Sequence, residues 1–159
     1  NRSEAIDPAR VLYRTTYHHP VFTAEGVKAQ ARRDEIISRA TPLGVWLDSH
    51  EGPEALASDI DRFTVIGVNF PKFTDGRSYS SARLLRERYG YDGEIRALGD
   101  VLQDQLFYMQ RCGIDAYALR ADKDIEKALA GLSVFSETYQ AAVDQPQPLF
   151  QRRSVQEPA

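Results

Sequence analysis

The sequence has few of the residues that build metal and redox centres. It contains one cysteine, Cys112, and three histidines in 159 residues. A single cysteine cannot form an internal disulfide, a Cys-x-x-Cys redox pair or a cysteine-ligated cluster. The histidines have no cysteine or glutamate at the spacing of a metal site, so we predict no bound metal at His18, His19 or His50. Such cysteine usage fits a reducing, cytoplasmic setting.

Other absences exclude whole classes of protein. No run of 18 apolar residues occurs, so we expect no transmembrane helix and no membrane partner. Neither a Gly-x-Gly-x-x-Gly segment nor a P-loop is found, so we expect no nucleotide cofactor and see no other cofactor motif. The net charge of −3 argues against general nucleic-acid binding. The content of 42% apolar and 27% charged residues is typical of one globular domain.

From Leu43 onward, short apolar runs alternate with amphipathic segments. The runs predict strands at 43–48, 63–70, 94–99 and 115–120. The segments between and after them predict helices at 52–63, 78–90, 100–113 and 122–140. Such alternation with short connections is typical of a parallel sheet covered by helices. We therefore predict an α/β fold of four β-α units in a parallel sheet with flanking helices, either an open doubly wound sheet or a half-barrel.

The two ends of the chain lack this alternation. Residues 1–42 are irregular and are predicted to form an N-terminal extension, in which 24–39 is a candidate helix. Residues 143–159 are rich in proline and glutamine, which predicts an extended, partly disordered tail. The α/β domain itself is predicted to span residues 43–142.

Polar residues follow each predicted strand. Because parallel α/β folds bind ligands beyond the carboxyl ends of their strands, we expect these residues to gather at one edge of the sheet. The longest of these loops, after the second strand, is also the richest in polar groups. The residues expected at this edge are Asp48, His50, Lys72, Asp75, Arg77, Asp100, Arg120 and Lys123.

The loop after the second strand leads into a helix predicted to begin near Ser78. No carboxylate follows within the first turn, and Arg77 precedes it, so the free N–H groups and the arginine suit an external anion. Gly76 would allow close backbone approach, and Asp75 could hold Arg77 in place. The alternative is that Ser78 is only an N-cap and the arginines are solvated, Arg86 and Arg88 among them. The candidate anion-binding residues are Lys72, Asp75, Gly76, Arg77, Ser78, Tyr79, Ser80 and Ser81.

The segment 100–113 offers a second set of candidates. Gln105 falls within the apolar face of the predicted helix, so it is either a structural hydrogen-bonding residue or a ligand contact. Asp100 and Asp104 lie four residues apart and are candidates for an acid and a base. The alternative is that Asp100 caps the helix and Asp104 joins a surface network. Cys112 is expected to be buried and inert.

Two segments of the chain resemble one bacterial family. They are FPKFTDGRSYSSARLLR at 70–86 and GDVLQDQLFYMQRCG at 99–113, within a likeness that spans about 43–150. The family is a domain of unknown function whose members are described as oxidoreductases involved in sulfite reduction. The resemblance implies association with a ferredoxin- or NADPH-linked sulfite reductase of assimilatory sulfur metabolism. Asn69 stands where the family leads us to expect an acidic residue.

Three hypotheses of function follow. The chain lacks the four cysteines of the cluster that couples to sirohaem, so it is not the reductase itself. The first hypothesis is an accessory protein of assimilatory sulfite reduction that binds a small oxyanion or the sulfite reductase through the edge around Arg77. The second is an enzyme on a phosphorylated or sulfur-containing small molecule, with Asp100 or Asp104 as acid or base. The third is a structural partner subunit that docks through the tail segment PQPLFQRR or an exposed helix face.

Overall fold

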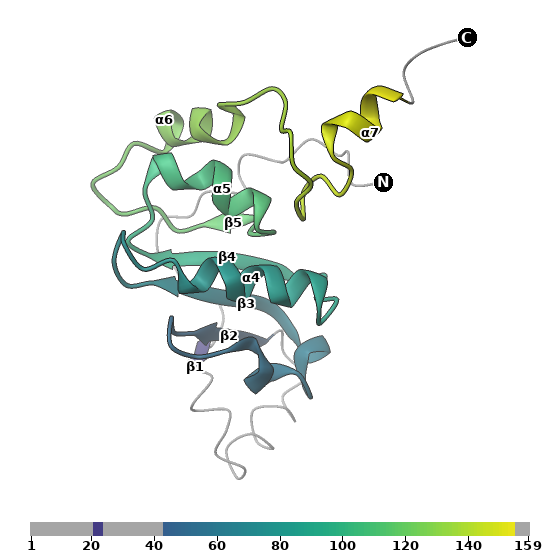
Figure 1. Ribbon diagram of the computed structural model, residues 1–159. Helices are drawn as coiled ribbons and strands as arrows, with labels where there is room; N and C mark the ends of the chain where they lie inside the picture. Colours follow the sequence, from purple (N-terminus) through teal and green to yellow (C-terminus); the bar gives the residue numbers. More distant parts are fainter. Residues whose placement is uncertain (1–20, 24–42, 155–159) are drawn as a thin grey trace.

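The computed structural model describes residues 21–23 and 43–154, which form an α/β structure around one parallel sheet (Figure 1). The sheet is open, and its strands are ordered β1-β2-β3-β4-β5. The four predicted strands are confirmed as parallel neighbours, although the last is shorter than predicted. A further strand was not predicted, because it lies in the irregular N-terminal extension. The strands are β1 (Val21–Thr23), β2 (Leu43–Leu47), β3 (Phe63–Phe70), β4 (Glu94–Gly99) and β5 (Ala116–Tyr117).

The strand order follows the chain, which determines where the connecting helices lie. Because parallel crossovers are right-handed, connections that always advance in the same direction place their helices on the same face of the sheet. Figure 1 shows α4 (Arg77–Glu87) lying along β3 and β4. The described strands contain no reversal of order, the point at which doubly wound sheets bind their ligands. A site must therefore be sought along the whole carboxyl edge.

The core lies between the sheet and these helices. Matching residues of neighbouring strands are paired in register, so that Val45 aligns with Ile66 and Ile66 with Ile95. Side chains alternate between the two faces of a strand, so these residues face the same side of the sheet as the row two residues further along, Leu47, Val68 and Ala97. Both rows are buried, as are Leu85 of α4 and Met109 of α5 (Leu106–Arg111). Cys112 is also buried, as expected, and burial raises the pKa of its thiol.

Several predicted helices are shorter than the sequence indicated. The helix at 52–63 is wrong, because the chain forms two 3-10 turns there, η1 (Pro53–Leu56) and η2 (Ile60–Arg62). Between them, Asp59 N bonds to Leu56 O and Arg62 N to Asp59 O, which are the short-range bonds of tight turns. These bonds span three residues, so the backbone does not continue as an α-helix here.

The predicted helices at 100–113 and 122–140 are likewise reduced. The first begins only at η3 (Gln103–Gln105), which continues into α5. The second is limited to α6 (Ile125–Ala130) and η4 (Gly131–Ser133). The Asp124 side chain caps α6 by accepting from the N–H groups of Glu126 and Lys127.

The tail prediction is corrected as well. Instead of being wholly extended, the chain forms α7 (Leu149–Ser154), which starts directly after Pro148. Proline suits this place, because it needs no N–H partner at the start of a helix. The candidate helix at 24–39 lies outside the described residues.

Arg86 holds three parts of the fold together, although it was expected at the surface. Its side chain is only 7% exposed. The guanidinium donates to the carbonyl oxygens of Tyr91, Gly93 and Gly113, and it pairs with Asp115 at 2.9 Å. Each of these partners lies in a loop beside β4 or β5. The periodicity of α4 did not reveal this role, because the partners are distant backbone carbonyls.

We predict that Arg86→Ala lowers the free energy of unfolding by about 3 kcal/mol, since it leaves three carbonyl groups without their donor. The measurement is urea unfolding followed by circular dichroism. Arg83→Ala is the matched control, because Arg83 is exposed and pairs only with Glu87 one turn away among the contacts described. It should cost at most about 0.5 kcal/mol. Equal midpoints for the two variants would contradict the structural role of Arg86.

Candidate functional site

The carboxyl edge of the sheet brings together the loops that follow β2, β3, β4 and β5. Residues 48–51 follow β2, residues 71–76 connect β3 to α4, Asp100 follows β4, and Arg120 comes soon after β5. Hydrogen bonds link these loops across the edge in two groups. One is centred on Arg77 and Asp48, and the other on Asp100.

Arg77 is held by Asp75, as predicted. Its Nε donates to Asp75 Oδ1 at 3.0 Å and its Nη2 to Asp75 Oδ2 at 2.6 Å, a two-pronged pair. Nη2 also donates to Ser49 Oγ at 2.9 Å, which ties the β3–α4 loop to the β2 loop. The guanidinium holds the pKa of the Asp75 carboxyl far below its usual value. The first turn of α4 contains no acidic residue, but Asp75 supplies a carboxylate just ahead of it and accepts from Arg77 N.

The other residues predicted to bind an anion do not all face the solvent at the start of α4. The N-cap of α4 is Gly76, so the alternative reading of Ser78 as N-cap is wrong. Ser78 is buried, and its hydroxyl donates to Asn69 O, which fixes α4 to the end of β3. Lys72, Gly76 and Ser80 are exposed, while Tyr79 and Ser81 are half-buried. The structure therefore brings the loop residues together but directs Ser78 inward.

Asp48 and Asn69 form the link between β2 and β3. Asn69 Nδ2 donates to Asp48 Oδ1 at 2.9 Å, and this bond is the main reason that the pKa of Asp48 is lowered. His50 Nδ1 lies 3.3 Å from Asp48 Oδ2. An acidic residue at position 69 would face the Asp48 carboxylate, so the asparagine suits this pairing. In the sequence alone, Asn69 stands out only as a departure from the family.

Glu51 contacts Asp48 and was not predicted as a site residue. It is buried, and its Oε2 accepts from Asp48 N at 2.9 Å. Within the described part of the chain, its Oε1 is buried without a hydrogen-bond partner. The signal in the sequence is the run of polar residues DSHE directly after a strand, which ends at Glu51.

Asp100 joins three of the edge loops. Gly99 has a φ of 93°, which turns the chain sharply, and Asp100 N then bonds to Phe70 O at 2.7 Å. Asp100 Oδ2 accepts from Phe73 N at 3.1 Å, and Oδ1 accepts from Arg120 Nη1 at 3.1 Å. Both carboxylate oxygens are therefore engaged in holding loops.

The predicted pairing of Asp100 with Asp104 is wrong in its geometry. The two were expected on one edge of one helix, but residues 100–102 are not helical and the first helical turn begins at Gln103. The competing interaction is the bond of Asp100 with Phe70 O, which keeps Asp100 at the end of β4. Gln105 is buried, and its Oε1 accepts from Leu102 N at 3.0 Å. This contact supports the alternative that Gln105 is a structural hydrogen-bonding residue and not a ligand contact.

The β3–α4 loop exposes an aromatic side chain at its tip. Phe73 is 51% exposed and stands beside the exposed Lys72. Asp100 holds the Phe73 amide from one side, and Asp75 N bonds to Lys72 O at 2.9 Å on the other. The loop is thus fixed while its side chains face the solvent.

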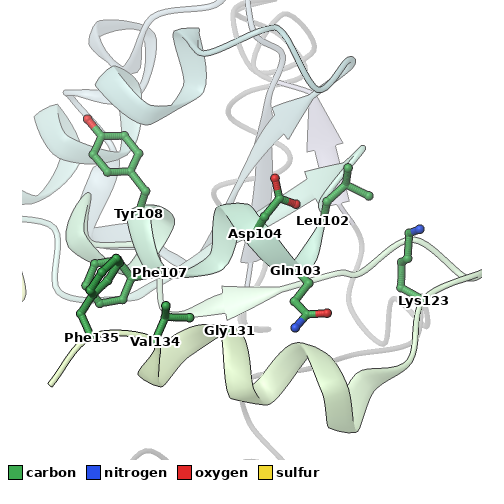
Figure 2. A pocket seen from close by; sticks show the side chains of 9 residues that line it. All are labelled: Leu102, Gln103, Asp104, Phe107, Tyr108, Lys123, Gly131, Val134 and Phe135. Carbon is green, nitrogen blue, oxygen red and sulfur yellow. The ribbon is translucent and has the colours of Figure 1, made fainter.

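A groove of about 700 Å³ lies beside this edge, between α5 and the segment after α6 (Figure 2). Its walls are apolar and aromatic at one end, where Phe107 packs edge-on against Phe135 at 5.0 Å. The sequence did not reveal the groove, because the second wall was predicted to continue as a helix. The groove is lined by Leu102, Gln103, Asp104, Phe107, Tyr108, Lys123, Gly131, Val134 and Phe135.

Neither a metal-binding cluster nor a membrane-spanning helix is found among residues 21–23 and 43–154. Among these residues, no three His, Cys, Asp or Glu side chains gather in a way that would hold a metal ion. In the same part of the chain, no helix has both the length and the apolar character needed to cross a membrane.

We predict that Asp100→Ala speeds hydrogen exchange of the Phe73 amide by at least about tenfold, because the variant removes the acceptor that holds this loop. The exchange is measured by NMR on labelled protein. Asp122→Ala is the control, since Asp122 contacts Arg120 but not the Phe73 amide. Unchanged exchange in Asp100→Ala would show that the loop is held in another way.

Comparison with known proteins places the chain in a family. The model of the family described as "Bacterial protein of unknown function (DUF934)" matches residues 44–150, which is more than half of the chain and includes the carboxyl edge and the groove. No curated protein matches the chain. The chain therefore belongs to this bacterial family, as the resemblance of its sequence had predicted.

Proposed function

We propose that this protein is an accessory protein of assimilatory sulfite reduction that docks on the sulfite reductase through the β3–α4 loop. The process and the partner are taken from the resemblance of its sequence. The observation that carries the docking role is the exposed Phe73 on a loop that Asp100 and Asp75 hold in place.

The surroundings of Phe73 suit a docking surface. Protein interfaces commonly have a central aromatic anchor surrounded by polar and charged groups. Here the anchor stands beside Lys72, and the Arg77–Asp75 and Arg120–Asp122 pairs lie on the same edge. A loop that is already ordered loses little conformational entropy on binding, which favours affinity.

A binding role fits the contacts of Asp100 better than catalysis does. A general acid or base needs an oxygen that can reach the substrate. Asp100 instead uses one oxygen on Phe73 N and the other on Arg120. Asp104 is exposed and lines the groove beside α5. The enzyme hypothesis therefore has less geometric support than the accessory role.

A second candidate function, oxyanion binding, has one observation in its favour. The Arg77 side chain is 61% exposed although it is fixed by Asp75 and Ser49. Its outer edge can meet a small oxyanion such as sulfite at the start of α4. Asp75 already pairs with this guanidinium and would compete with an oxyanion for it. Oxyanion binding is therefore a weaker candidate than protein docking.

The docking role predicts that Phe73→Ser weakens binding to purified assimilatory sulfite reductase by at least about tenfold, because it removes the apolar anchor. Isothermal titration calorimetry gives the dissociation constant per protomer. Tyr139→Ser is the control, since it removes an exposed aromatic side chain that lies in neither the β3–α4 loop nor the groove. Wild-type protein that fails to bind, or Phe73→Ser that binds equally well, would refute this role.

The oxyanion candidate predicts a rise in melting temperature of the wild type with sulfite or sulfate at tens of millimolar, through preferential binding to the folded state. Arg77→Ala should lose this rise while chloride at matched ionic strength has no effect on either protein. Absence of any shift in the wild type removes the oxyanion candidate and leaves the docking role intact.

A further inference from the structure

The C-terminal helix α7 presents one side to the solvent. Leu149 N bonds to Tyr139 O at 3.0 Å, and Arg152 donates to Thr138 O at 2.9 Å and pairs with Glu137. These contacts attach one side of the helix to the segment just before it. Phe150 is 60% exposed, and Arg153 is exposed as well. The two are three residues apart, so they lie on the same side of the helix.

The groove beside α5 has the complementary features. At its apolar end, Val134 and Phe135 are both more than 60% exposed, and Phe107 lies against Phe135. Figure 2 shows the carboxylate of Asp104 away from this aromatic end. The groove thus has a place for an aromatic ring and, separately, the exposed carboxylate of Asp104 for a cation, while Lys123 also lines it. A helix that carries a phenylalanine and an arginine one turn apart matches both features.

The helix of the same chain does not fill this groove. Its contacts hold it beside residues 137–139, and Figure 1 shows α7 set apart from α5 and α6. Among the described residues that line the groove, none belongs to α7. A second copy of the chain has the same helix and the same groove, so two copies can satisfy each other.

We propose that the groove binds α7 of a second copy, with Phe150 in the apolar end and Arg153 paired with Asp104. Because the exchange is reciprocal, it produces a closed two-fold dimer with two identical contacts. Each contact removes Phe135, Val134 and Phe150 from water, the side chains that a monomer leaves exposed. This inference does not depend on the proposed docking role, because the Phe73 loop does not line the groove.

The test is the mass of the full chain in solution, measured by sedimentation equilibrium over a range of concentrations. We expect a monomer–dimer equilibrium in the wild type. Asp104→Arg and Arg153→Asp should each weaken the dimer by at least about tenfold, because each places like charges together. The double variant Asp104→Arg with Arg153→Asp should restore it to within about threefold of the wild type.

One further variant, Phe150→Ser, tests the apolar part of the contact, and Phe73→Ser is its control. Phe150→Ser should be monomeric at concentrations where Phe73→Ser remains dimeric. A wild type that is monomeric at all concentrations overturns the proposal, as does a dimer that the charge variants leave unchanged. Failure of the double variant to restore the dimer also overturns it. The charge variants alter exposed side chains, so they remain informative if an aromatic substitution impairs folding.

Discussion

The carboxyl edge of this protein depends on one carboxylate, that of Asp100. It receives the Phe73 amide from one loop and the Arg120 guanidinium from another, while its own N–H bonds to the end of β3. The turn at Gly99 makes this position possible, because a side chain there would meet Phe70 O at 2.4 Å. Loops after three strands are thereby fixed relative to one another, and Phe73 is held in the solvent.

Two separate surfaces result from this arrangement. The edge is polar, closely hydrogen-bonded and centred on Phe73, whereas the groove beside α5 is apolar at one end and has the charged Asp104 and Lys123 in the rest of its lining. Polar loops over a rigid sheet commonly carry function in α/β proteins. The groove differs because its aromatic side chains are exposed in the described part of the chain and would lose contact with water when a second copy covers them. Separate surfaces would allow the protein to associate with itself and with a partner at the same time.

The sequence predicted the sheet and its polar edge well, because β3 and β4 are dense apolar runs and parallel strands share one edge. Helix extents were predicted poorly, since backbone turn bonds around Asp59 and the sharp turn at Gly99 prevail over helical periodicity. The roles of Ser78 and Arg86 depend on backbone carbonyls distant in sequence, which no spacing rule reveals. The groove was missed because the segment that forms its second wall was predicted to continue as a helix.

The claim that the β3–α4 loop is a docking surface is tested most directly by hydrogen–deuterium exchange of the protein with and without purified sulfite reductase. Docking through Phe73 predicts that residues 71–76 exchange more slowly in the complex, while residues 131–135 of the groove keep their rates. Slower exchange only in the groove, or no change anywhere in the presence of saturating reductase, would contradict it.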